Sequence, residues 1–103
     1  MSALPFRVEG WQLLVGELAP AQLVDLRQPE AFARGHIEGA VNLPYDQLQE
    51  RAFEVIDPTR TALLIDPGGA RAAEMAIWLR ERGVEAGYLA GGMARWQGEV
   101  VKG

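Results

Sequence analysis

The chain has 103 residues, enough for one hydrophobic core but too few for two, so we expect a single domain over residues 1–103. Its formal net charge of -4 and its scattered arginines argue against a surface that binds nucleic acid or an anionic membrane. The chain contains no cysteine, which removes disulfides, thiolate metal sites and thiol nucleophiles.

The N-terminal segment bears on location. Residues 1–5 carry neither the basic start nor the apolar stretch of a secretory signal, and no apolar run approaches the ~18 residues of a membrane span. We therefore expect a cytoplasmic protein that contacts neither nucleic acid nor a membrane. His36 is the only histidine and is too isolated to indicate a metal site, so we expect no metal and no cofactor.

Apolar periodicity and the positions of Pro and Gly predict strands that alternate with helices. Short apolar or alternating runs bounded by turn residues are typical of strands, and apolar residues three or four apart are typical of helices. In chain order we expect strand 6–8, helix 10–18, strand 22–26, helix 30–34, strand 40–43, helix 45–53, strand 62–65, helix 70–82, strand 86–89 and a short helix over 93–96. Strand 6–8 is expected at an edge of the sheet.

The apolar spacing also predicts which side chains are buried. The expected stripes are Trp11, Leu14, Val15 and Leu18 in helix 10–18, and Ala73, Ala76, Ile77 and Leu79 in helix 70–82. Gly83 follows the second helix as a C-cap. We expect Trp11 and Trp96 to pack against the domain, and Trp78 to face outward, where it would mark a partner surface.

The alternation of strands and helices indicates an α/β protein. Crossover connections of this length pair strands in parallel and place helices on both faces of the sheet. We therefore expect a three-layer α/β/α fold with a five-stranded, mainly parallel sheet. In such sheets ligands bind beyond the carboxyl ends of the strands.

The loop over residues 66–71 follows the most apolar predicted strand, so it lies at the carboxyl ends of the strands. It reads Asp66-Pro67-Gly68-Gly69-Ala70-Arg71 and opens helix 70–82. The first turn of a helix presents N–H groups without a partner in the helix, together with the positive end of the helix dipole, so such a loop can hold an anion. The two glycines are expected to let the backbone curl inward, but Asp66 is itself an anion.

Three motifs follow one another along the chain. Residues 23–32 carry an apolar-Asp-apolar-Arg pattern, and residues 35–44 carry Gly-His-Ile-x-Gly-Ala. Residues 91–96 carry a closing Gly-Gly-apolar-x-x-Trp pattern. Together these motifs resemble those of the rhodanese-like domain, a small sulfurtransferase fold. The resemblance covers about residues 23–96 and implies the rhodanese-like version of the α/β/α fold.

The resemblance also implies where the family's chemistry would lie. Its active loop is similar to Cys-x-x-Gly-x-Arg, and the cysteine carries a sulfane sulfur as a persulfide. Gly69 and Arg71 keep this pattern, but Asp66 stands in the place of the cysteine. We therefore expect no catalytic residue and a binding or regulatory role, with another protein or a small anion as partner. The alternative is a sulfurtransferase that works with a partner's thiol; the oligomeric state stays open.

The roles of the loop residues leave alternatives. Arg71 either binds an incoming anion or neutralises Asp66, which would close the loop on itself. Asp66 as an aspartyl nucleophile would need a metal site or a second carboxylate, which the loop does not offer. Asp25, Arg27 and His36 could be acid-base machinery. The resemblance implies instead that they belong to motifs that brace the loops, so we expect a structural network.

Overall fold

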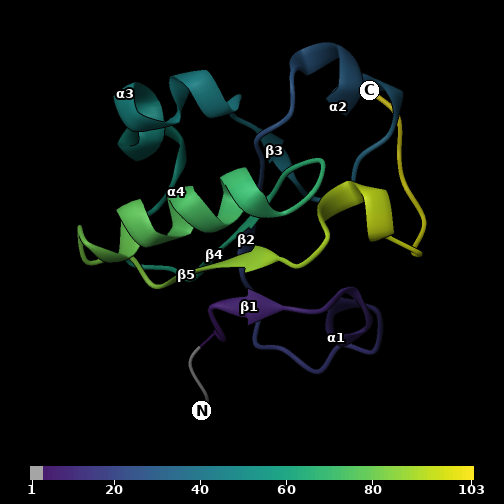
Figure 1. Cartoon of the computed structure of the whole chain (residues 1–103), viewed down its shortest axis with the longest axis horizontal. Helices are drawn as coiled ribbons and strands as arrows, with labels where there is room; N and C mark the ends of the chain where they lie inside the picture. The colour runs from purple at the N-terminus through teal and green to yellow at the C-terminus, as the bar shows by residue number, and fades with distance from the viewer. Residues whose placement is uncertain (1–3) are drawn as a thin grey trace.

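Five parallel strands form one sheet in the order β1-β5-β4-β2-β3 in the computed structural model, which describes residues 4–103 (Figure 1). The strands are β1 (Arg7–Val8), β2 (Gln22–Asp25), β3 (Val41–Asn42), β4 (Ala62–Ile65) and β5 (Ala86–Leu89). All four residues of β4 are buried, as its uninterrupted apolar run predicts for a central strand. The predicted parallel sheet with an edge strand at its N-terminal end is confirmed.

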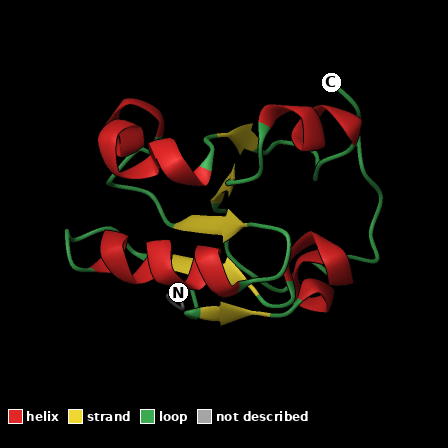
Figure 2. Ribbon diagram, turned by 45° about the horizontal axis from the view of Figure 1, so that its top comes forward, coloured by secondary structure: helices red, strands yellow, loops and turns green. Residues whose placement is uncertain are grey.

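Helices connect the strands and surround the sheet (Figure 2). They are α1 (Gly10–Leu14), α2 (Pro29–Arg34), α3 (Tyr45–Val55), α4 (Ala70–Arg80) and a 3-10 turn, η1 (Gly92–Arg95). The first helix is shorter than predicted because Gly16 adopts a φ of 68°, a conformation that ends a right-handed helix.

Side chains alternate across β4 and so divide the core into two layers. Leu64 points to the face covered by α3 and α4, where it packs with Leu48 and Leu79. Ile65 points to the other face, where Ile37 and Leu89 lie beside it. This alternation follows from the period of two in a strand and produces the predicted three-layer arrangement.

Several predicted orientations are wrong. The buried residues of α4 are Ala72, Met75, Ala76 and Leu79. Ile77 is 51% exposed and Trp78 is half-buried, with Arg82 lying 3.8 Å above its ring. In α1 the residue that packs inward is Leu13, and Trp11 is 56% exposed. Helices rich in alanine, or only five residues long, have too little contrast in their apolar pattern for the sequence to determine which face is buried.

A turn closed by a side chain, at Asp57 to Thr59, precedes β4. The Asp57 carboxylate accepts hydrogen bonds from the Thr59 backbone N–H at 2.9 Å and from its hydroxyl at 2.7 Å. These bonds favour the charged carboxylate and lower the pKa of Asp57 below its ordinary value.

Thr59→Ala is therefore expected to raise the pKa of Asp57 toward its ordinary value. The lowered pKa contributes stability that is present above the unfolded pKa of ~3.9 and is lost as pH falls through the folded pKa. Thr59→Ala should therefore lower the free energy of unfolding at neutral pH and leave it unchanged at pH values below both pKa values. An NMR titration of the Asp57 carboxyl carbon measures the shift. Thr61→Ala is the control, because Thr61 donates to the Pro20 carbonyl instead. An unchanged Asp57 pKa in Thr59→Ala would contradict this assignment.

Candidate functional site

The loop after β4 folds around the carboxylate of Asp66, which is 2% exposed. One carboxylate oxygen, Oδ1, accepts a hydrogen bond from the backbone N–H of Gly69. The other, Oδ2, accepts from the N–H groups of Arg71 at 2.9 Å and Ala72 at 3.1 Å. The Asp66 side chain thus binds the N–H groups of the first turn of α4, which are the groups that would otherwise hold an external anion.

The segment that contains η1 holds this loop from the side of β5. The N–H of Met93 donates to the Asp66 carbonyl at 2.8 Å, and the N–H of Ala94 donates to the Pro67 carbonyl at 3.0 Å. Gly92 has a φ of 57°, and a Cβ there would lie 2.6 Å from the Pro67 carbonyl carbon and 2.7 Å from the Gly68 nitrogen. The loop and the closing Gly-Gly motif therefore pack backbone against backbone, which requires glycine at position 92.

The two glycines within the loop differ in what they do. Gly69 has a φ of 106°, and a Cβ there would lie 3.1 Å from the Gly91 nitrogen. Gly68 has an ordinary φ, and a Cβ there would meet no atom within 4 Å. The prediction that both glycines allow the loop to curl inward is therefore wrong for Gly68. The left-handed conformation occurs at Gly69 alone within the loop.

Gly92→Ala is expected to lower the free energy of unfolding by about 1–3 kcal/mol, because a methyl group at position 92 pushes the loop away from β5. Gly68→Ala is the matched control. It should leave stability unchanged or raise it by about 0.4–1 kcal/mol, since alanine restricts the unfolded chain. Urea denaturation of the two variants measures both effects. Equal stabilities for the two would show that the close approach at Gly92 carries no cost.

The guanidinium of Arg71 lies over the ring of Tyr45, 4.7 Å from its centroid. The Tyr45 hydroxyl donates to Glu74 at 2.7 Å, and this bond raises the pKa of Tyr45. Among residues 4–103 no ion pair joins the Arg71 guanidinium to Asp66. The alternative in which the guanidinium neutralises Asp66 is therefore wrong, and backbone N–H groups solvate the carboxylate instead. No motif or spacing pointed to Tyr45 or Glu74 at this place.

Asp25 and Arg27 form a buried ion pair at the end of β2, next to β4. Arg27 Nη2 lies 2.9 Å from Asp25 Oδ2 and also donates to the Gly35 carbonyl at 2.7 Å. Asn42, which sequence reasoning missed, donates to the carbonyls of both residues. These contacts tie β2 to β3 and to the turn after α2, and they leave the Asp25 carboxylate with 0% exposure.

The side chain of His36 contacts other residues than this ion pair does. Its ring stacks on Phe32 with 3.7 Å between the centroids, and Nδ1 is 2.9 Å from the Phe32 carbonyl. Its backbone exchanges two hydrogen bonds with Val101, which ties the C-terminal segment to the domain. The structure therefore places His36 in a different set of contacts from Asp25 and Arg27.

Comparisons with known proteins identify the family to which this fold and loop belong. A family model described as the rhodanese-like domain matches residues 11–99. The chain belongs to the rhodanese-like family. Among solved structures, a rhodanese-like domain protein from Staphylococcus aureus aligns with a TM-score of 0.81 and 26% identity, over 94% of this chain and 97% of that one. A rhodanese-related protein from Thermoplasma volcanium has the same fold, with a TM-score of 0.83 and 22% identity.

Curated relatives of this rhodanese-like domain include proteins named as sulfurtransferases. Putative sulfurtransferase YtwF of Bacillus subtilis is 31% identical, over 76% of this chain and 75% of YtwF. Thiosulfate sulfurtransferase PspE of Escherichia coli is 31% identical, over 78% of each protein. Uncharacterized protein YqhL of Bacillus subtilis is 38% identical over 78% of this chain, which spans 64% of the length of YqhL.

Two further observations concern membrane-spanning helices and metal sites. No helix among residues 4–103 is long and apolar enough to span a lipid bilayer. Within the same residues, no group of three or more His, Asp or Glu side chains is placed to hold a metal ion. The cytoplasmic location stays a prediction.

Proposed function

We propose that this rhodanese-like domain transfers no sulfur through a residue of its own and acts as a binding or regulatory module. The observation that supports this proposal is the position of Asp66, which stands where the family motif has its cysteine. A persulfide needs a sulfur atom on the protein, and the 103 residues contain no cysteine. A carboxylate oxygen cannot replace it as a carrier of sulfane sulfur.

The geometry of the loop adds a second reason. The Asp66 carboxylate already binds the N–H groups of Gly69, Arg71 and Ala72. An incoming thiosulfate or sulfate would have to displace a buried negative charge that is covalently attached to the same loop, and like charges at this distance repel strongly. Binding of a partner protein or small anion by this domain is therefore proposed to occur outside the loop.

A thiosulfate:cyanide assay tests this proposal. The domain is incubated with thiosulfate and cyanide, and thiocyanate is measured over time. PspE, named as a thiosulfate sulfurtransferase, serves as the positive control. We expect thiocyanate to form at the rate of the buffer blank. Formation above the blank that scales with the concentration of the domain would refute the proposal.

The second candidate is sulfur transfer with a thiol supplied by a partner. The names of YtwF and PspE favour it, as does the retention of Gly69 and Arg71 in the loop. In this reaction an external thiolate attacks the sulfane sulfur of thiosulfate, forms a persulfide and releases sulfite. Repeating the assay with glutathione in place of cyanide and measuring sulfite tests this candidate. Acceleration by the domain would favour it over the non-catalytic role.

A further inference from the structure

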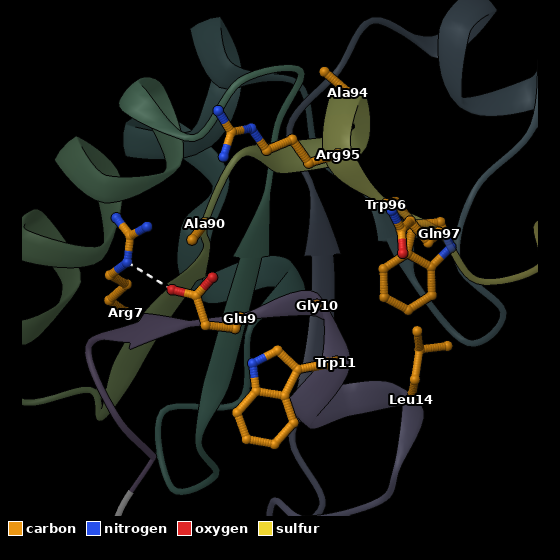
Figure 3. Close-up of a pocket in the computed structure, with 10 residues that line it drawn as sticks. All are labelled: Arg7, Glu9, Gly10, Trp11, Leu14, Ala90, Ala94, Arg95, Trp96 and Gln97. Atoms are coloured by element: carbon orange, nitrogen blue, oxygen red, sulfur yellow. Dashed lines mark hydrogen bonds and ion pairs between the residues drawn. The ribbon is translucent and has the colours of Figure 1, made fainter.

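A pocket of about 460 Å³ lies between the start of α1 and η1 (Figure 3). Arg7 in β1, Glu9 directly after β1 and Ala90 directly after β5 contribute to its wall. It therefore opens at the carboxyl edge of the sheet, where α/β proteins bind ligands, and its volume is typical of a small-molecule site. None of the residues 66–71 lines it, so it is a different site from the Asp66 loop.

Two indole rings, together with Leu14, Ala90 and Ala94, form the apolar part of this pocket. Trp96 is half-buried: its ring lies 3.6 Å from the position of a Cβ on Gly10, and its Nε1 donates to the Glu99 carbonyl at 3.1 Å. These contacts hold the Trp96 ring in place. Trp11 is 56% exposed, an unusual exposure for so large an apolar side chain. A flat apolar group in the pocket would cover indole surface that now contacts water.

The charges in the pocket favour an anion. Arg7 and Glu9 neutralise one another through an ion pair of 2.8 Å, drawn as a dashed line in Figure 3. Arg95 is exposed and, within residues 4–103, its side chain forms neither an ion pair nor a hydrogen bond. Its aliphatic stem packs over Gly91, where a Cβ would lie 2.8 Å from Arg95 Cγ. One positive charge therefore remains available in the pocket, although the chain as a whole is acidic.

We propose that this pocket binds a carboxylate attached to a flat apolar ring, with the ring against Trp11 and Trp96 and the carboxylate on Arg95. A planar guanidinium pairs with a carboxylate through two parallel hydrogen bonds, which sets the orientation of the ring. The same chemical group occurs in free aromatic acids and in a peptide chain that ends in an aromatic residue. This inference deepens the proposed binding role and rests on it.

An NMR titration of the backbone amides with three matched probes tests the inference. Phenylacetate carries both the ring and the carboxylate, phenylacetamide lacks the charge, and acetate lacks the ring. We expect saturable shifts in α1 and η1 with phenylacetate, binding of phenylacetamide weaker by roughly tenfold, and no saturation with acetate. Equal affinity for phenylacetate and phenylacetamide, or shifts confined to residues outside the pocket, would overturn the proposal.

Variants test the assigned residues. Arg95→Gln and Trp11→Ala are each expected to weaken phenylacetate binding by roughly tenfold. Arg51→Gln is the matched control, because Arg51 is an exposed arginine on α3 outside the pocket, and it should bind like the parent. The amide spectrum of each variant away from the pocket shows that it is folded. Unchanged binding by folded Arg95→Gln would overturn the role of that residue and with it the proposal.

A peptide arm identifies the source of the ligand. The tripeptide Gly-Gly-Phe with a free carboxyl end is compared with phenylacetate. Tighter binding of the tripeptide assigns the site to a chain end of a partner, and tighter binding of phenylacetate assigns it to a free aromatic acid; either outcome supports the chemistry. If neither probe binds, the proposed ligand site is wrong. The thiocyanate assay does not depend on this result, so failure of this inference is distinguishable from failure of the proposed function.

Discussion

Asp66→Cys is expected to give the domain a thiosulfate:cyanide sulfurtransferase activity, which we propose the parent does not have. The new Sγ would lie at the end of β4 beside the N–H groups of Gly69, Arg71 and Ala72, which bind the carboxylate in the parent. Such surroundings lower a thiol pKa from ~8.5 to roughly 3.5–7.5, so the side chain should be largely thiolate at neutral pH. A thiolate is the form that attacks sulfur.

The expected reaction has two steps. The thiolate attacks the sulfane sulfur of thiosulfate, the S–S bond of thiosulfate breaks, and sulfite leaves with its electron pair. Cyanide then takes the outer sulfur of the persulfide as thiocyanate and restores the thiolate. Pro67 has no N–H to offer to the persulfide, so we expect weaker turnover than in an enzyme whose loop has an amide donor at that position.

Two measurements check this prediction. Thiocyanate formation by Asp66→Cys is compared with that by Asp66→Ser, which has a similar size and no sulfur. The rate of alkylation by iodoacetamide against pH reports the thiol pKa directly. A folded cysteine variant with an ordinary thiol pKa and no thiocyanate would show that the N–H groups no longer bind an anion once the carboxylate is removed.

Asp66→Ala is expected to lower the free energy of unfolding by about 3–5 kcal/mol, because it leaves buried N–H groups without an acceptor. Three N–H groups lose their bonds at once. Asp46→Ala is the matched control. Asp46 lies in the first turn of α3 and is exposed, so its loss should cost no more than about 1 kcal/mol through the helix dipole. Urea denaturation measures both variants.

Formate is expected to restore part of the stability of Asp66→Ala. The removed carboxylate leaves a space of its own size lined by N–H groups, and a ligand that binds only the folded state raises the free energy of unfolding with its concentration. The parent should respond far less, because Asp66 already fills that space. Chloride at the same ionic strength controls for salt. Equal stabilisation of parent and variant by formate would contradict the geometry of the loop.

The architecture and the absence of a thiol nucleophile follow from the amino-acid sequence alone. The apolar run over 62–65 and the alternation of strands with helices specify a parallel sheet, because short crossovers permit few other pairings. Three ordered motifs pointed to the family, and the chain without cysteine pointed to the lost persulfide. The bounds of β4 and β5 were predicted to the residue, because a Gly or a charged residue lies within two positions of each end of these strands.

The groups that solvate the Asp66 carboxylate, by contrast, depend on how the helices pack. Spacing along the chain placed Arg71 within reach of Asp66, but the packing of α3 beside α4 provides the Tyr45 ring, and the guanidinium lies there instead. The sequence predicted that first-turn N–H groups can hold an anion, but which of them meet the Asp66 carboxylate depends on the backbone directions at Gly69 and in the first turn of α4. The exposure of Trp11 likewise depends on how α1 docks, because a helix of five residues carries too little periodicity to determine its own buried face.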